Sequence, residues 1–546
     1  MIKKGRLLLL APAFLGLGLS VLPAQVHAEA AKDNTVTEST AGWTKDAGKW
    51  KYIGSDGNAL VGWHYLSKRN SPEKMDWFLF DSQGQLVTFS PKVTGELFGT
   101  LIDEPASSAT PAVIKNGWYE ISGNDGYYLE GTLAGDYQIL KYSDGIFTSV
   151  DANGVSDRGG ALSLSKKSNE STQKWWASAN DDGSYILINE ATGLQLEANA
   201  NEFSGYRGAE KKTITLKKAG VRPEYFGAKG DGVTDDTEAI IKAINSSNIV
   251  EFKKRYNTSE TIVIDKDNMT FLGDDGGMIV THPGLTVFRV KGKNVTFDGV
   301  SFMGSYTREQ STDKACIFYQ TDTKDEDVVD YNAVIKNCKF INTGLRGVHV
   351  HSVWVSKSDF TPLRIASNIT VKDCMFDGHK IGVCCSGPDN VTVDHCSFSN
   401  AFYEHITFDW RSRHCRAINN TFNGHEGGIG SIGIDSAEDI EIKNNEFFNT
   451  VLYGITISAQ TRTNKDVVIS DNTFNYSGGI GGIHFNVYEQ GPSGENVTVR
   501  NNVFNTGKGY SVLVDSAGNN IVFEGNTYNK NTPVINGSSS TIKTDF

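Results

Sequence analysis

The stretch His405–Arg411 reads HITFDWR, with polar residues at every second position and apolar residues between them. Alternate side chains of a strand point to opposite faces, so His405, Thr407, Asp409 and Arg411 are predicted to share one face. A carboxylate, an imidazole and a guanidinium on one surface can move protons and hold an anionic group. The row is therefore a candidate catalytic surface, provided that neighbouring strands extend it.

A repeated pattern surrounds this stretch. The segments VIKNCKF, ITVKDCMF, VTVDHCSF, RAINNTF, IEIKNNEF, VVISDNTF, VTVRNNVF and IVFEGNTY recur about every 20–35 residues, a spacing typical of a solenoid. Two positions before the last aromatic residue stand Cys338, Cys374, Cys396, Asn420, Asn445, Asn472, Asn502 and Asn526. Stacked coils would place these side chains ~4.8 Å apart, so that the Asn amides bond from one coil to the next. The repeat predicts an all-β fold, a right-handed parallel β-helix over 220–546.

A second strand follows each repeat, and its outward residues form three predicted columns. The first is His351, Ser386, Asp409, Asp435, Ser458, Asn486 and Asp515. The second is His349, Cys384, Thr407, Gly433, Thr456, His484 and Leu513, and the third is Gly347, Gly382, His405, Ser431, Gly454, Gly482 and Ser511. We expect the small residues to leave a trough into which Asp, His and Arg project.

Asp409 and Asp435 are the strongest catalytic candidates, because they stack on neighbouring coils. Like charges ~5 Å apart repel, and one carboxyl tends to keep its proton, which is the acid–base condition for glycosidic cleavage. A separation near ~5 Å favours retention and a wider one favours inversion. His405 is predicted to relay a proton or bind a hydroxyl, and Arg411 to hold a substrate carboxylate or lower the pKa of an Asp.

Further residues are predicted to bind substrate along the trough. They are His349, His351, His484, Asn486, Tyr488 and Glu404, with Tyr403 and Trp410 as additional sugar platforms. The alternative is structural, because an Asp at a strand end often caps a turn and any solvated β-helix face carries polar columns. A register error of one residue would turn the whole set to the other face.

The segment Phe226–Ile240, FGAKGDGVTDDTEAI, resembles the start of secreted parallel β-helix proteins. These form the pectate-lyase-like superfamily, which includes rhamnogalacturonases, mannuronan epimerases and phage tailspikes. The resemblance implies the fold and action on polysaccharide, but no particular reaction. The ordered Asn-Thr-Asp, Asp-Asp, Gly-His-Gly and Arg-Ile-Lys motifs of pectin hydrolases are missing, and RGVHVHS matches the Tyr-Gly-Phe-Asp-Pro-His type of epimerase motif in part. For a lyase base, Arg346, Arg411 and Arg413 are available.

Two regions precede the solenoid. Residues 41–90 carry Gly-Trp units and Gly turns, and resemble choline- and glucan-binding cell-wall repeats through Trp43, Trp50, Tyr52, Trp63, Tyr65, Trp77 and Phe80. The resemblance implies that these aromatics bind a wall or glucan polymer; the alternative is that they only hold two hairpins together. Residues 116–218 contain Gln173-x-Trp175 and resemble a ricin-type β-trefoil lectin, with a β-rich spacer as the alternative.

The first 28 residues have the parts of a secretory signal: three basic residues, an apolar run and a small-residue cleavage site. Removing them takes away three positive charges, so the formal charge changes from -12 to -15. An acidic secreted protein without a second apolar segment of spanning length is predicted, and a general nucleic-acid binder is disfavoured. All seven Cys lie between Cys316 and Cys415, an odd count that predicts buried thiols rather than disulfides or zinc ligands.

Three functions follow from these features. The first is Asp-dependent hydrolysis of a polysaccharide. The second is β-elimination or C5-epimerisation on a uronic-acid polymer, and the third is non-catalytic binding of cell wall or glycan. No cofactor is required, calcium is compatible with the site, and the oligomeric state stays open, a trimer included.

Overall fold

The computed structural model describes residues 42–545. The exceptions are residues 47–48, 61, 70, 81–82, 88–109, 112–116, 124–138, 144–145, 149–152, 158–161, 167–170, 180–183, 190–193, 200–201, 207–213, 275–276, 323–326, 355–361, 429, 477–479, 487–491, 507–508, 517, 530–532 and 536–541. The predicted signal segment 1–28 therefore lies outside the described residues, as does Tyr488.

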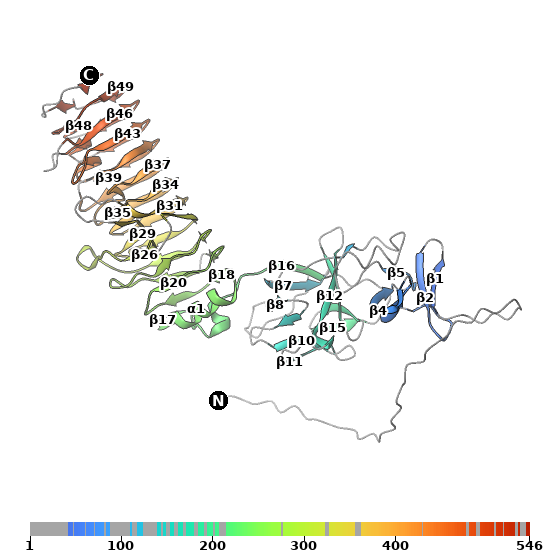
Figure 1. Cartoon of the computed structure of the whole chain (residues 1–546). Helices are drawn as coiled ribbons and strands as arrows, with labels where there is room; N and C mark the ends of the chain where they lie inside the picture. Colours follow the sequence, from blue (N-terminus) through green and yellow to red (C-terminus); the bar gives the residue numbers. More distant parts are fainter. Residues whose placement is uncertain are drawn as a thin grey trace, which may run out of the picture.

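The described residues after 220 coil into three parallel sheets, so the predicted parallel β-helix is confirmed (Figure 1). The first sheet contains β18 Ile249–Phe252, β21 Thr270–Gly273, β24 Thr296–Asp298, β27 Val328–Lys336, β31 Pro362–Lys372, β34 Asp389–Asp394, β37 Arg413–Ile418, β40 Glu438–Lys443, β43 Asn464–Ser470, β46 Gly494–Arg500, β49 Ile521–Glu524 and β52 Ile542–Lys543, with β30 Val353–Trp354 beside β31. The second contains β17 Asp231–Asp235, β19 Arg255–Asn257, β22 Met278–Val280, β25 Ser301–Met303, β28 Lys339–Ile341, β32 Met375–Asp377, β35 Ser397–Ala401, β38 Thr421–His425, β41 Glu446–Phe448, β44 Thr473–Tyr476, β47 Val503–Thr506 and β50 Thr527–Tyr528.

The third sheet, called here the site sheet, carries the predicted columns. Its strands are β20 Ile262–Ile264, β23 Phe288–Val290, β26 Ala315–Gln320, β29 Arg346–His351, β33 Ile381–Ser386, β36 Ile406–Asp409, β39 Gly430–Asp435, β42 Tyr453–Ser458, β45 Gly481–Phe485, β48 Tyr510–Val514 and β51 Val534–Ile535. Each coil of the chain thus passes from the first sheet through the second to the site sheet.

A continuous apolar core fills the inside of the solenoid and fixes which residues face outward. The phenylalanines of the second sheet stack from β28 to β47 with successive ring centroids 4.5–5.1 Å apart. Helix α1, Thr237–Ser246, adds its buried Ile240 and Ile244 to this core at the start of the solenoid. Every core side chain removed from water stabilises the stack, so a register shift in any one coil would be costly.

The predicted Asn ladder is confirmed. Asn420 donates from its side-chain amide to Oδ1 of Asn445 at 3.1 Å, and Asn445 donates to Asn472 at 3.0 Å. The ladder continues to Asn502 and Asn526, at 2.9 and 3.0 Å. These buried bonds hold one coil on the next at the corner between the first two sheets.

The seven Cys are buried and unpaired, as predicted. Cys338, Cys374 and Cys396 occupy the Asn-ladder position in the earlier coils, and the Cys396 backbone N–H donates to Asn420 Oδ1 at 2.9 Å. Burial raises the pKa of the Cys374 thiol well above its usual value. Their burial and their place in the ladder favour a structural role.

The first described region consists of short antiparallel hairpins. Their strands are β1 Gly42–Asp46, β2 Lys49–Ile53, β3 Gly62–Lys68, β4 Ser71–Phe80 and β5 Leu86–Val87. Trp50 is buried, with the Arg69 guanidinium 4.2 Å from its ring centroid, so the prediction of Trp50 as an open sugar platform is wrong. Trp43 and Tyr52 are half-buried and pack against the small core around Trp50. The side chains of Trp63 and Trp77 lie outside the description, and wall binding stays a prediction.

The middle region is β-rich. Its antiparallel strands are β6 Thr110–Pro111, β7 Gly117–Gly123, β8 Ile139–Ser143, β9 Ile146–Thr148, β10 Asn153–Asp157, β11 Leu162–Lys166, β12 Trp175–Ala179, β13 Tyr185–Asn189, β14 Gln195–Asn199, β15 Glu202–Tyr206 and β16 Ile214–Lys218. Gln173 and Trp175 are buried, which agrees with a structural Gln-x-Trp pair. The lectin-like trefoil stays a prediction. Among the described residues, no helix has the length and apolar character needed to cross a membrane.

Candidate active site

Two of the three predicted columns exist on the site sheet. The register joins His351, Ser386, Asp409, Asp435 and Ser458 in the first column. It joins His349, Cys384, Thr407, Gly433, Thr456, His484 and Leu513 in the second. The residues between the columns, such as Ile406 and Phe408, are fully buried in the core, so the columns face outward.

Three carboxylates gather on the coils of β36 and β39. Asp409 and Asp435 lie in register on these neighbouring strands, which places their backbones ~4.8 Å apart. The Glu404 side chain lies beside Gly433. A Cβ built on that glycine would be 3.9 Å from both Glu404 Cγ and Thr407 Cγ2. Gly433 therefore leaves a small notch beside the carboxylates, with room for a Cβ at ordinary contact distance.

The surroundings favour a proton on Asp409. Burial, followed by the negative charges of Asp435 and Glu404, raises the pKa of Asp409 well above its usual value, while the Thr407 hydroxyl and the Arg346 guanidinium oppose the shift. Burial also raises the pKa of Asp435, but two hydrogen bonds oppose it. The pKa of Asp409 is thus raised more strongly than that of Asp435, so the shared proton is favoured on Asp409.

Asp435 is held in place by the turn that follows β42. Its Oδ1 accepts the Gln460 backbone N–H and the Ser436 hydroxyl, each at 2.8 Å. Donors directed at one oxygen stabilise the ionised form and fix the orientation of the carboxylate. Asp435 therefore has a structural role in addition to any catalytic one, and this role matches the turn-capping alternative noted for strand-end Asp residues.

A cavity of about 350 Å³ lies on the coils just before the carboxylates. Its lining includes Arg346, His349 and His351, with the aromatic rings of Trp354 and Trp410 5.2 Å apart. The Arg346 guanidinium lies 3.3 Å from His349 Nδ1, so this nitrogen must accept, and Nε2 carries the proton toward the Ser386 hydroxyl at 3.2 Å.

Both histidines in this cavity are neutral near pH 7. Burial and the positive charge of Arg346 lower the pKa of His351 to about 4. The same causes, with His351 added, hold the pKa of His349 well below its usual value. Neutral imidazoles and an arginine can bind sugar hydroxyls and an acidic group, and substrate binding by His349 and His351 stays a prediction.

On the other side of the carboxylates, His484 is part of a second aromatic group. Its Nε2 lies 2.9 Å from Asp515 Oδ2, and its ring stacks on Tyr453 with centroids 4.3 Å apart. Burial lowers the pKa of His484, although Asp515 opposes the shift. Asn486 follows β45 and is half-buried, while Tyr403 is exposed.

The prediction that His405 projects into the trough is wrong. His405 is fully buried, and its ring lies 5.7 Å from both Phe398 and Phe422 of the core stack. Its Nδ1 is 3.2 Å from Nε2 of the buried His379. The chain bends before β36, so strand alternation does not extend back to this residue. A Cβ on Gly382, its neighbour in the third column, would also meet the Phe398 ring, so that column faces the interior corner.

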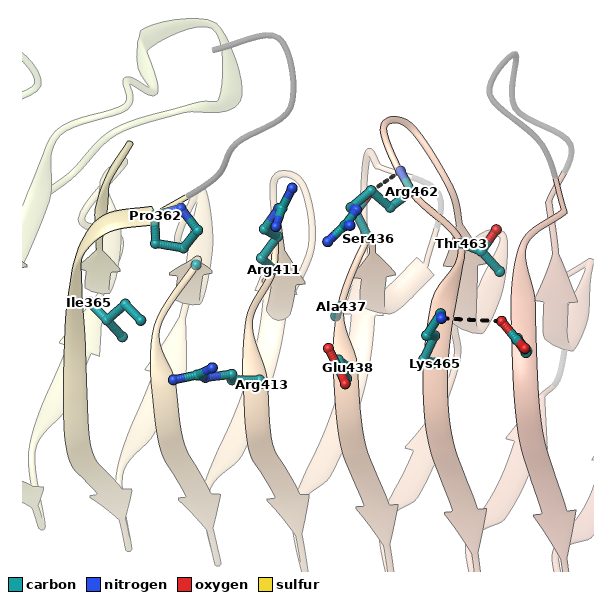
Figure 2. A pocket seen from close by; sticks show the side chains of 12 residues that line it. Pro362, Ile365, Arg411, Arg413, Ser436, Ala437, Glu438, Arg462, Thr463 and Lys465 are labelled. Atoms are coloured by element: carbon teal, nitrogen blue, oxygen red, sulfur yellow. Dashed lines mark hydrogen bonds and ion pairs between the residues drawn. The ribbon is translucent and has the colours of Figure 1, made fainter. Parts of the chain in front are cut away.

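The prediction that Arg411 shares a face with Asp409 is also wrong. β36 ends at Asp409, and Trp410 and Arg411 both adopt left-handed conformations, with φ of 52° and 70°. The two residues turn the chain toward the first sheet, so Arg411 lines a different cavity (Figure 2). Arg346, on β29, is the arginine whose charge acts on Asp409.

Sequence reasoning overlooked Phe318, Trp354 and Tyr453 as parts of the site. Tyr453 had a usable signal, because its neighbour in register is Gly481, whose absent side chain leaves room for the ring. Phe318 stacks on His349 at 4.8 Å, but nothing in its own segment marks it as exposed.

No group of three or more His, Cys, Asp or Glu side chains in the described part of the chain has a geometry suited to a metal ion. Compatibility with calcium stays a prediction.

Residues 286–474 match the family model described as "Right handed beta helix region". This part of the chain is a right-handed β-helix. The hand agrees with the prediction, and the matched residues include β36, β39 and the carboxylates.

A curated relative is the "Depolymerase, capsule K30/K69-specific" of Klebsiella phage K64-1, 27% identical over 186 residues. The match covers 31% of this chain and 22% of that protein, so it spans about a fifth of the relative's length. Among solved structures, the surface adhesin PfbA of Streptococcus pneumoniae aligns at 12% identity with a TM-score of 0.42, covering 59% of this chain and 93% of that one. An exopolygalacturonase of Thermotoga maritima aligns at 13% identity with a TM-score of 0.44, covering 59% and 91%.

Proposed function

We propose that this chain is a secreted enzyme that cleaves a polysaccharide by carboxylate-dependent glycoside hydrolysis. The observation that carries the proposal is the pairing of Asp409 and Asp435 in register, with Glu404 at the same notch. Glycoside hydrolysis needs one carboxylic acid and one carboxylate at the scissile bond. A raised pKa on one member of a carboxylate pair is how proteins supply both.

Asp409 is the general acid in this proposal. Its raised pKa keeps a proton available for the leaving glycosidic oxygen. Asp435 or Glu404 provides the carboxylate that acts at the anomeric carbon, either directly as nucleophile or by activating a water molecule. The first route retains the anomeric configuration and the second inverts it.

The groups on either side of the carboxylates suit a sugar chain. Trp354 and Trp410, which line the cavity just before the carboxylates, present aromatic surface that can stack on the apolar faces of sugar rings. Neutral His351 and His484 supply donors and acceptors for hydroxyl groups. The phage depolymerase that matches this chain is named for action on a capsule, which supports a polysaccharide substrate.

The test is the release of new reducing ends from a panel of bacterial capsular, cell-wall and plant polysaccharides. Wild type is compared with Asp409→Asn and Asp435→Asn, which keep the shape of the side chains and remove the acid. Asp466→Asn is the matched control: Asp466 lies on β43 of the first sheet and already adopts the left-handed conformation that Asn favours. Activity in wild type and control, but in neither trough variant, supports the proposal; equal activity in all four overturns it.

A second candidate is β-elimination on a uronic-acid polymer. The observation that favours it is the Arg346 guanidinium beside two neutral histidines, since elimination needs a cation at the substrate carboxylate and a neutral base. In that case Arg346→Gln would abolish activity, Asp409→Asn would not, and the products would carry an unsaturated end.

A further inference from the structure

The cavity of Arg346 and His349 is also lined by a carboxylate of the protein itself, Asp313. Asp313 lies in the connection between β25 and β26, and its Oδ1 accepts hydrogen bonds from Arg346 Nη2 at 3.0 Å and Lys380 Nζ at 2.7 Å. Arg346 begins β29, and Lys380 directly precedes β33, the next strand of the site sheet. Two cations from neighbouring coils therefore meet at one carboxylate oxygen.

The charges around Asp313 do not cancel. Its carboxylate faces the two cations that bind it, and Lys314 is the remaining charged residue of the cavity lining. The two lining histidines have lowered pKa values and add no charge near pH 7. Asp409 is another acid that the charge of Arg346 reaches, and its raised pKa favours the neutral form. The residues that line the cavity or bind Asp313 thus keep a net positive charge, which attracts a further anion.

Asp313 is weakly held by its two cations. Its side chain is 68% exposed, and both of its printed ion pairs use the same oxygen, Oδ1. The connection that carries it, residues 304–314, contains no buried residue. Exposed ion pairs contribute little to stability, because water screens both charges. Asp313 can therefore leave Arg346 and Lys380 at low cost.

The pairing also leaves part of the Arg346 guanidinium unused. Its Nη1 faces His349 Nδ1 at 3.3 Å, while its Nε is buried and has no hydrogen-bond partner among the described residues. A guanidinium can bind a carboxylate through two parallel hydrogen bonds, whereas Asp313 engages only one of its nitrogens through the carboxylate. The site thus has more donors than its own carboxylate satisfies.

We propose that a carboxylate-bearing sugar unit of the substrate binds Arg346 and Lys380 in place of Asp313, which acts as a displaceable internal competitor. The carboxylate of Asp313 itself demonstrates that both cations can reach one such group. Trp354 and Trp410, in the same lining, offer aromatic surface to the sugar ring. This assignment, which rests on the proposed action on a polysaccharide, makes the substrate an acidic one.

The test is calorimetric titration of the full-length protein with hexagalacturonate and with its methyl ester, which has the same sugar chain without the charges. Asp313→Asn should bind hexagalacturonate about two- to fivefold more tightly than wild type, since the competing carboxylate of an exposed pair is removed. The methyl ester should bind equally to both proteins. Arg346→Gln should bind hexagalacturonate about tenfold or more weakly, and Lys380→Gln should show part of this loss.

Asp327→Asn is the matched control, because Asp327 forms the same kind of exposed pair with Arg364, at 2.9 Å, beside the first sheet. It should bind hexagalacturonate as wild type does, which separates a local effect from the change in net charge. Binding is measured directly, so an absence of hydrolysis, seen as no new reducing ends, is distinguished from an absence of this site.

Four results would overturn the proposal. They are no binding of hexagalacturonate by wild type and Asp313→Asn, binding by Asp313→Asn no tighter than by Asp327→Asn, an equal gain of Asp313→Asn for the methyl ester, and wild-type binding by both Arg346→Gln and Lys380→Gln.

Discussion

The two ends of β36 show how differently one short strand can use its polar residues. At its carboxyl end, Asp409 faces the trough among Asp435 and Glu404, and their charges add to the effect of burial on its pKa. Just before its amino end, His405 is buried and packs against Phe398 and Phe422. Both pKa values are shifted in the direction that favours the neutral form, but Asp409 lies on the surface that a substrate can reach, whereas His405 is buried in the core.

The difference teaches that a perturbed pKa alone does not mark a catalytic group. Burial is the largest cause of the shift in both residues. The two residues differ in their access to solvent. Asp409 lies in an outward column beside the Gly433 notch, whereas His405 lies against the interior stack of phenylalanine rings. Four predictions test this distinction between an accessible and a sealed neutral group.

The largest expected effect is the loss of turnover in Asp409→Asn. Removing a general acid typically costs about 10²–10⁴-fold in kcat, whereas substrate binding should change little because the side-chain shape is kept. Initial rates on the polysaccharide that wild type degrades measure the effect, with Asp466→Asn as the control. A kcat within tenfold of wild type would show that Asp409 is not the general acid.

The second prediction concerns Glu404→Gln and the pH–rate profile. The Glu404 charge raises the pKa of Asp409, so its removal should lower that pKa. A general acid works only while protonated, and activity is therefore lost as the pH rises through its pKa. The alkaline limb of kcat/KM should move to lower pH. An unchanged alkaline limb would show that Asp409 does not control it.

The third prediction is that Asp409→Asn stabilises the protein while it inactivates it. A carboxyl with a raised pKa in the folded state stabilises the fold most at low pH, and this contribution is lost as the pH rises through the folded pKa. The variant should therefore match wild type near pH 4 and be more stable by roughly 1 kcal/mol at pH 8. Denaturant unfolding at the two pH values measures the gain, and a variant that is less stable at pH 8 would contradict it.

The smallest effect on activity is expected for His405→Phe. The ring fits between Phe398 and Phe422, and kcat should stay within about twofold of wild type. Burial and the neighbouring histidines hold the pKa of His405 well below its usual value, so its contribution to stability is present above about pH 6.5 and lost as the pH falls. The variant should lose less stability than wild type between pH 7 and pH 4. A large loss of kcat in a folded variant would show that His405 contributes to catalysis.

The sequence predicted side-chain positions correctly where the strands are regular. The apolar alternation of Ile406 and Phe408 was enough to place the two outward columns in register, because the core allows only one face inside. The same alternation wrongly placed His405, one residue before β36, because the chain bends there. It also wrongly placed Arg411, two residues after β36, because Trp410 and Arg411 form a left-handed turn. The cavity lined by Arg346 could not be predicted, because its Trp354 comes from a strand of the first sheet that is distant in sequence from Phe318.

The central claim is hydrolysis at the carboxylate notch. It is tested most directly by mass spectrometry of products formed from a degraded polysaccharide in H₂¹⁸O. We predict fragments that have each gained one water, with ¹⁸O at the new reducing end, and no such fragments from Asp409→Asn. Fragments with an unsaturated end and no incorporated ¹⁸O, still formed by Asp409→Asn, would contradict it.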